Sequence, residues 1–130
     1  MPTDFDESDF PLVRVHAHGQ SADSDVEERL AFAKRLLQRR EKVALVFDTT
    51  GGRPLTARQR KMWADWLTEH DVLVRKYLVG CAIVVDSALT RGVFTGVFWL
   101  WSPPMPYTFA ATPRQAEAWA RERLAEQRSR

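Results

Sequence analysis

Apolar and polar residues follow two different patterns along this chain, and the two patterns predict two kinds of β-strand. From Val13 to His18 they alternate one by one, which is typical of a strand with one face in the core. Residues 42–48 and 78–86 are instead apolar almost throughout, and each run ends in an aspartate. Unbroken runs of this kind indicate central strands covered on both faces. Residues 107–110 predict a short further strand.

Segments whose apolar residues have helical spacing lie between these strands. Capping boxes predict helix starts at Ser24 and Thr56. In a capping box the side chain of the capping residue accepts a hydrogen bond from the backbone N–H three residues later, and the side chain of that later residue accepts one from the N–H of the capping residue. A further helix is predicted from Thr112, because a proline follows at the first helical position. Residues 88–101 are also long enough for a helix. The predicted order is therefore β-α-β-α-β-α-β-α.

This alternation predicts one α/β domain, with a mixed, mostly parallel sheet of four or five strands and flanking helices. The length of 130 residues suits a single domain. The domain is expected to span residues 10–128, after a solvated acidic tail at residues 1–9. The alternating strand at residues 13–18 is expected at an edge of the sheet, which Pro11 near its start would tolerate.

Composition narrows the classes of function. The chain has 19 basic and 17 acidic residues, and a net charge of +2 is too balanced to indicate a nucleic-acid partner. One cysteine cannot form an internal disulfide, which favours a reducing compartment and predicts a cytoplasmic protein. No apolar run approaches the ~18–20 residues of a membrane span, so none is expected.

The sequence contains no recognisable catalytic motif, and we expect no metal and no cofactor. His16 and His18 lie on one face of a predicted strand, as two metal ligands could, but surface imidazoles are the favoured interpretation. Cys81 lies inside an apolar strand, where it is predicted to be a small core residue rather than a nucleophile. The sequence therefore favours a protein that is not an enzyme.

One candidate site is the polar loop after the first unbroken apolar run. Its carboxylate, hydroxyl, glycine and arginine residues are Asp48, Thr49, Thr50, Gly51, Arg53 and Arg58. Such a loop could bring backbone N–H groups to an anion, or carry a hydroxyl that is itself phosphorylated. The alternative is a strand-to-helix turn whose side chains satisfy the N–H groups of the loop.

A second candidate site is the segment at residues 93–101, which would be apolar on nearly every side as a helix. Its aromatic residues are Phe94, Phe98, Trp99 and Trp101. Those that face outward would form a surface for a partner protein, a second copy of the chain or a lipid. The alternative is that the proline-rich residues 102–106 fold back and cover them.

Taken together, these elements resemble a small bacterial STAS or SpoIIAA-like domain over about residues 10–127. The residues that carry the resemblance are the strand ending at Asp48 with its hydroxyl–glycine loop, the strand at 81–86, the aromatic helix, and Ala116 to Trp119. The resemblance implies a non-catalytic module like an anti-sigma-factor antagonist, which binds a kinase or another protein. Some members of that family are switched by phosphorylation in an Asp-Ser-Ser-Gly motif. Residues 48–51 are similar, which places Thr50 at the switch position with Thr49 beside it.

The sequence thus predicts a regulatory, protein-binding module of the STAS-like type with no catalytic residues. Its partner is expected to be another protein, and the segment at residues 93–101 could also join two copies of the chain. The alternative is a carrier or sensor of a small apolar ligand or lipid, with a pocket beneath the aromatic helix. An enzyme with an unrecognised site is the third possibility.

Overall fold

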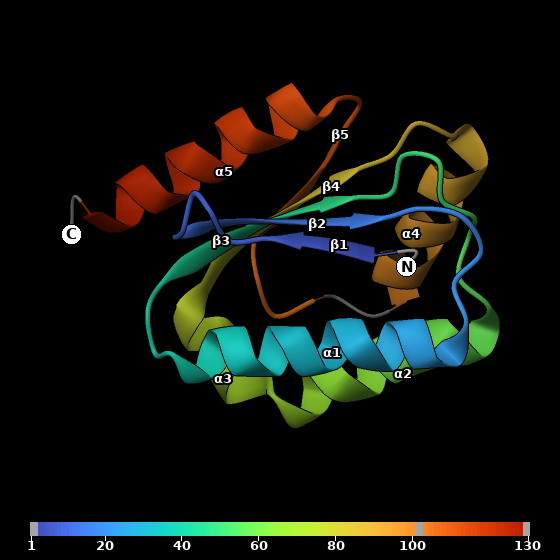
Figure 1. Ribbon diagram of the computed structural model, residues 1–130, viewed down its shortest axis with the longest axis horizontal. Helices are drawn as coiled ribbons and strands as arrows, with labels where there is room; N and C mark the ends of the chain where they lie inside the picture. Colours follow the sequence, from blue (N-terminus) through green and yellow to red (C-terminus); the bar gives the residue numbers. More distant parts are fainter. Residues whose placement is uncertain (1–2, 101–102, 129–130) are drawn as a thin grey trace.

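Five strands form one sheet whose spatial order follows the sequence, β1-β2-β3-β4-β5 (Figure 1). The strands are β1 Thr3–Asp6, β2 Leu12–Ala17, β3 Val43–Asp48, β4 Leu78–Val84 and β5 Tyr107–Ala110. β1 pairs with β2 in antiparallel orientation, and all other neighbours are parallel. This computed structural model describes residues 3–100 and 103–128, without the side chains of Val93, Val97, Trp99, Leu100 and Arg128.

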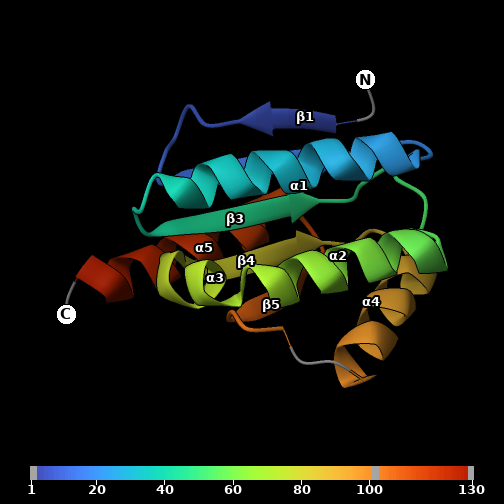
Figure 2. The same cartoon turned by 90° about the horizontal axis from the view of Figure 1, so that it is seen from below.

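The helices divide unequally between the two faces of the sheet. They are α1 Asp23–Gln38, α2 Ala57–Glu69, α3 Asp71–Tyr77, α4 Ala88–Leu100 and α5 Pro113–Arg128. Parallel crossovers are almost always right-handed, so a strand order that advances in one direction places every connecting helix on the same face. Accordingly α1, α2 and α3 lie on one side of the sheet and α5 on the other (Figure 1). Helix α4 lies beyond the carboxyl ends of β3 and β4 (Figure 2).

Two hydrophobic cores result from this arrangement. The smaller one packs the small side chains of α5, Ala116 and Ala120, against Val46 and Val84 of the central strands. The larger one lies between the sheet and α1–α3, and half-buried aromatic residues of α4 pack against it. Because the central strands are buried on both faces, every residue of β4 is buried. This is the pattern that the unbroken apolar runs predict.

The structure confirms the α/β class, the mostly parallel sheet and the central position of the two apolar strands. It also confirms the helix start at Thr56, whose hydroxyl accepts from Gln59 N while Gln59 Oε1 accepts from Thr56 N, both at 3.1 Å. The first connecting helix begins earlier than predicted. Its N-cap is Ala22, and the Asp25 carboxylate, instead of Glu27, accepts the N–H of the capping residue.

The predicted acidic tail is wrong for residues Thr3–Asp6, which form β1. Thr3 is buried and the Phe5 ring stacks on Phe32 of α1 at 4.3 Å, so these two side chains point toward the core. Consequently β1, and not β2, lies at this edge of the sheet, and β5 lies at the other. The predicted element order also lacked α3, which follows α2 directly after His70.

Among the described residues no helix is long and apolar enough to cross a membrane.

Candidate functional site

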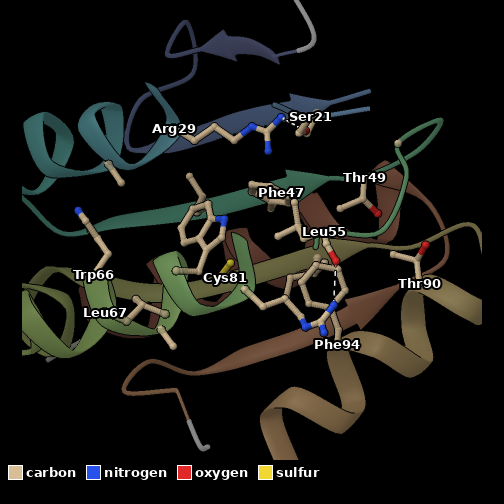
Figure 3. Close-up of a pocket in the computed structure, with 18 of the residues that line it drawn as sticks. Ser21, Arg29, Phe47, Thr49, Leu55, Trp66, Leu67, Cys81, Thr90 and Phe94 are labelled. Atoms are coloured by element: carbon tan, nitrogen blue, oxygen red, sulfur yellow. Dashed lines mark hydrogen bonds between the residues drawn. The ribbon is translucent and has the colours of Figure 1, made fainter. Parts of the chain in front are cut away.

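A cavity of about 150 Å³ lies between the sheet and helices α1, α2 and α4 (Figure 3). The sheet contributes Phe47, Cys81 and Ile83 to its wall. Other wall residues come from α1, α2, α4 and the loop at residues 52–55. The wall is mainly aliphatic and aromatic, and a cavity of this kind is the usual form of a small-molecule site.

Aromatic rings form much of the wall. The Trp63 ring on α2 meets Phe47 edge-on at 5.9 Å and Trp66 at 6.5 Å. On the α4 side, Phe94 and Phe98 line the cavity, and each ring lies about 6 Å from the Phe109 ring of β5. Such contacts fix the rings in place, so that the cavity has a defined shape.

The inward position of Phe94 and Phe98 corrects the expectation that they form an outward surface. Both are half-buried and pack against the larger core, because β5 places Phe109 and Tyr107 directly opposite them. The side chain of Trp99 and the whole of Trp101 lie outside the described residues. Met105, from the proline-rich segment, is buried and also lines the cavity. The pocket expected beneath the aromatic helix is therefore present.

The charged residues that line the cavity are, within the described part of the chain, all arginines: Arg29, Arg53 and Arg60. Arg53 is exposed, and Arg60 is half-buried and donates from Nη1 to the carbonyl oxygen of Leu55 at 2.8 Å. Arg29 differs from both because only 2% of it is exposed. The wall of the cavity is therefore mainly apolar, and the charged side chains in it are all cationic.

The buried Arg29 guanidinium is held by two neutral hydroxyls. Nε donates to Thr3 Oγ1 at 2.8 Å and Nη2 donates to Ser21 Oγ at 2.6 Å. The remaining nitrogen, Nη1, is buried without a hydrogen-bond partner among the described residues. Burial lowers the pKa of Arg29, and the nearby charges of Asp25 and Glu28 only partly oppose this effect. A buried cation without a paired anion is costly.

Arg29 was not among the residues predicted from the sequence, although a signal was present. The inward face of α1 carries Val26, Leu30, Ala33 and Leu37 at helical spacing, and Arg29 lies three residues after the first of them. An arginine within an apolar stripe either extends its charged end to solvent or is buried with polar partners. In the structure, the preceding Ser21 and strand β1 cover it.

Trp63 carries a second buried donor in the same wall. Its Nε1 atom has no hydrogen-bond partner among the described residues. Buried indole N–H groups usually find an acceptor. Helical spacing places Trp63 on the apolar face of its helix, but such spacing indicates only the side on which a ring lies and not the polar contacts of its edge.

The backbone N–H groups of the loop at residues 49–53 are used inside the protein. Thr49 N donates to the Val84 carbonyl, Thr50 N to Asp48 Oδ1, and Gly51 N to Asp86 Oδ2 at a longer 3.4 Å. The next two N–H groups donate to backbone carbonyl oxygens. The loop therefore has the bonding of a strand-to-helix turn, and it offers no cradle of N–H groups to an anion.

The two threonines of this loop are in different environments. Thr49 is buried, and its hydroxyl donates to the Val84 carbonyl at 2.6 Å. Thr50 is exposed, and its carbonyl oxygen lies 2.9 Å from His16 Nε2. A modifying enzyme could reach Thr50 without unfolding the turn, whereas Thr49 is inaccessible.

The basic residues that follow the loop are largely engaged with neighbours. Arg58 is exposed and forms an ion pair of 3.2 Å with Asp23 of α1, which is on the same side of the sheet. Lys61 pairs with Asp65 at 2.7 Å, one turn further along α2. Arg53 and Arg60 are the members of this group that line the cavity. These residues do not converge on one anion site.

The remaining candidates for chemistry lie apart from one another. His16 and His18 have ring centres 5.1 Å apart, and His18 Nε2 lies 3.4 Å from Asp4 Oδ2 of β1. No metal-binding group of three or more ligands occurs among the described residues. Cys81 faces the cavity, but burial raises the pKa of its thiol to about 12. The thiolate needed for nucleophilic attack is therefore scarce at neutral pH.

Comparison with known proteins identifies the fold. No family model and no curated protein matches this sequence. Among solved structures, the chain is similar to an uncharacterized protein of the DUF3478 family with a SpoIIAA-like fold, from Shewanella loihica PV-4. The similarity covers 91% of each chain with a TM-score of 0.63 and 17% sequence identity. The chain thus has a SpoIIAA-like fold, which confirms the fold that the resemblance implied.

Proposed function

We propose that this domain is a non-catalytic module that binds a small apolar molecule in the cavity beneath α2 and α4. The cavity itself is the observation that carries the proposal: it has a volume of about 150 Å³ and a mainly apolar wall. A dry apolar cavity of about this volume in another protein accommodates one benzene molecule. The expected ligand is therefore compact, with an aromatic ring or a short branched chain, rather than a long-chain lipid.

The loop at residues 49–53 lines the cavity and also lies at the protein surface, and this position supports a sensor role. Thr49, Gly52 and Arg53 line the cavity, while their neighbour Thr50 is exposed. A bound molecule would contact one side of this loop, and a partner protein could contact the other. Ligand binding would then change the stability or position of a surface that a partner recognises.

The experiment is a titration of the purified protein with toluene, followed by NMR through the indole N–H resonances. Saturable shifts in the resonances of Trp63 and Trp66, which line the cavity, would support the proposal. Native mass spectrometry of the protein purified gently from cells would show whether a small molecule is retained. The absence of saturable binding by toluene and of any retained molecule would contradict the proposal.

The second candidate function is a phosphorylation-switched, protein-binding module. The observation that favours it is the exposed hydroxyl of Thr50 in a loop similar to the family's switch motif. A phosphate there adds about −1.5 to −2 charges at neutral pH and changes the local surface. The variants Thr50→Ala and Thr50→Glu test it, once a partner is known, because one of them should alter partner affinity. Equal affinity for both would remove this candidate.

A further inference from the structure

The cavity wall combines apolar rings with positive charge that has no counter-ion in the wall. Each of the charged side chains that line it in the described part of the chain is an arginine. Arg29 is the most buried of the three, at 2% exposed, and it is part of the cavity wall instead of lying at the surface. A purely hydrocarbon ligand would leave this charge uncompensated.

The Arg29 guanidinium has one donor group left for a ligand. Thr3 and Ser21 occupy Nε and Nη2, and both are neutral acceptors. Figure 3 shows Nη2 directed at Ser21 and the other terminal nitrogen turned to the opposite side, toward Phe47 and the cavity. The hydrogen bonds to Thr3 and Ser21 also hold the guanidinium in this orientation before any ligand binds, which lowers the entropic cost of binding.

We infer that the natural ligand is a small carboxylate with an apolar body, whose carboxyl group accepts a hydrogen bond from Arg29 Nη1. This inference rests on the proposed function and deepens it by naming the charge of the ligand. The buried indole N–H of Trp63, in the same wall, is available to a second acceptor atom of the ligand. The apolar body then contacts the rings of Phe47, Phe94 and Phe98.

Size and charge together favour a carboxylate over larger anions. A cavity that accommodates about one benzene ring leaves little room for a tetrahedral headgroup beside an apolar body. A planar carboxylate fits such a space, and it is a usual partner for arginine. Arg53 and Arg60 add positive charge without a carboxylate in the described wall, so the field also attracts an anion.

The test compares benzoate with benzamide, which has nearly the same shape but no charge, and includes toluene as the apolar reference. We expect the parent protein to bind benzoate at least about tenfold more tightly than benzamide, because hydrogen bonds to charged groups are the stronger ones. Arg29→Met should abolish this preference and leave toluene binding intact. Arg53→Met, which removes a second positive charge of the wall, should reduce the preference less than Arg29→Met does. The control Arg75→Met, at an exposed position outside the wall, should leave the preference unchanged.

The outcomes separate this inference from the proposal on which it rests. If toluene and benzamide bind but benzoate binds no better, the cavity is a ligand site and the carboxylate inference is overturned. If the preference disappears in Arg53→Met and persists in Arg29→Met, the anion lies at the exposed arginine and the assigned role of Arg29 is wrong. If none of the three probes binds, the proposed function itself fails. The comparison of benzoate with benzamide on the parent protein tests the inference even if Arg29→Met does not fold.

Discussion

Arg29 and Ser21 are joined by a buried hydrogen bond of 2.6 Å from the guanidinium to the hydroxyl, and no carboxylate accompanies it. The bond satisfies one donor of the guanidinium, but a neutral hydroxyl does not compensate the charge. Because the same guanidinium also donates to Thr3 of β1, it links the edge strand, α1 and the segment that precedes α1. The residue is therefore both a structural link and the main polar feature of the cavity.

This relationship predicts different effects for two substitutions in the ligand-free protein. Ser21→Ala leaves a further guanidinium donor unsatisfied and should lower the free energy of unfolding by about 1–3 kcal/mol. Arg29→Met keeps most of the side-chain volume and removes the buried charge, so it should cost less than Ser21→Ala or even stabilise. Urea denaturation of both variants measures this. A larger loss for Arg29→Met would show that the charge is already compensated without a ligand.

The two threonines of the loop should respond differently to a negative charge. Thr50→Glu places a carboxylate at an exposed position and should change the free energy of unfolding by less than about 0.5 kcal/mol. Thr49→Glu buries a charge and breaks the hydrogen bond to the Val84 carbonyl, so a loss of several kcal/mol is expected. Thermal melting of both variants checks the difference. Equal losses would contradict the assignment of Thr50 as the accessible residue.

Gly80 of β4 allows the close packing of α5 on the sheet. A Cβ at this position would come within 2.8 Å of Trp119 Cζ3 and 2.9 Å of Arg123 Cγ. Gly80→Ala should therefore destabilise the protein by about 1–3 kcal/mol. The control is Gly96→Ala in α4, where a Cβ meets nothing within 4 Å and alanine should stabilise by about 0.5–1 kcal/mol. A neutral effect of Gly80→Ala would mean that α5 can shift freely away from β4.

The ion pair between β2 and α5 predicts part of the pH dependence of stability. Arg14 Nη2 donates to Glu117 Oε1 at 2.7 Å and holds the pKa of Glu117 below its ordinary value of 4.5. A lowered carboxyl pKa stabilises the fold above its unfolded-state value, and this contribution is lost as the pH falls through the folded-state pKa.

Glu117→Gln should therefore lower the free energy of unfolding at pH 7 by up to about 1 kcal/mol, and have little effect at pH 2. The control is Glu122→Gln at an exposed position of the same helix. Denaturation at both pH values compares the two variants. An equal loss for Glu117→Gln at pH 2 and pH 7 would exclude the ionised pair as its cause.

The sequence predicts the elements whose signals are local. The apolar runs that form β3 and β4 and the capping box at Thr56 each depend on neighbouring residues alone, and the structure confirms them. Strand β1 was missed because Asp4 and Asp6 suggest a solvated segment. Its formation depends on pairing with β2 and on the stacking of Phe5 on Phe32, and both are long-range contacts.

The candidate site was predicted only in part, because it too depends on long-range contacts. A pocket beneath the aromatic helix was predicted only for the alternative function of a small-molecule carrier. The direction of Phe94 and Phe98 could not be decided from a helix that is apolar on nearly every side. The position of Phe109 on β5 decides it. The role of Arg29 depends on its hydrogen bonds to Thr3 and Ser21 and on the cavity that it lines. The residues that form these features are far apart in the sequence.

A larger side chain in the cavity wall should take up the space that a ligand needs. Ala64 of α2 lines the cavity, whereas Ala57 of the same helix is exposed and lies outside the wall. The measurement is the dissociation constant for toluene in the parent protein, in Ala64→Leu and in the control Ala57→Leu. We expect the parent and the control to bind one molecule, and Ala64→Leu to bind at least about tenfold more weakly while remaining folded, because the added methyl groups occupy the cavity. Equal toluene affinity in a folded Ala64→Leu, or no binding by the parent, would contradict the account.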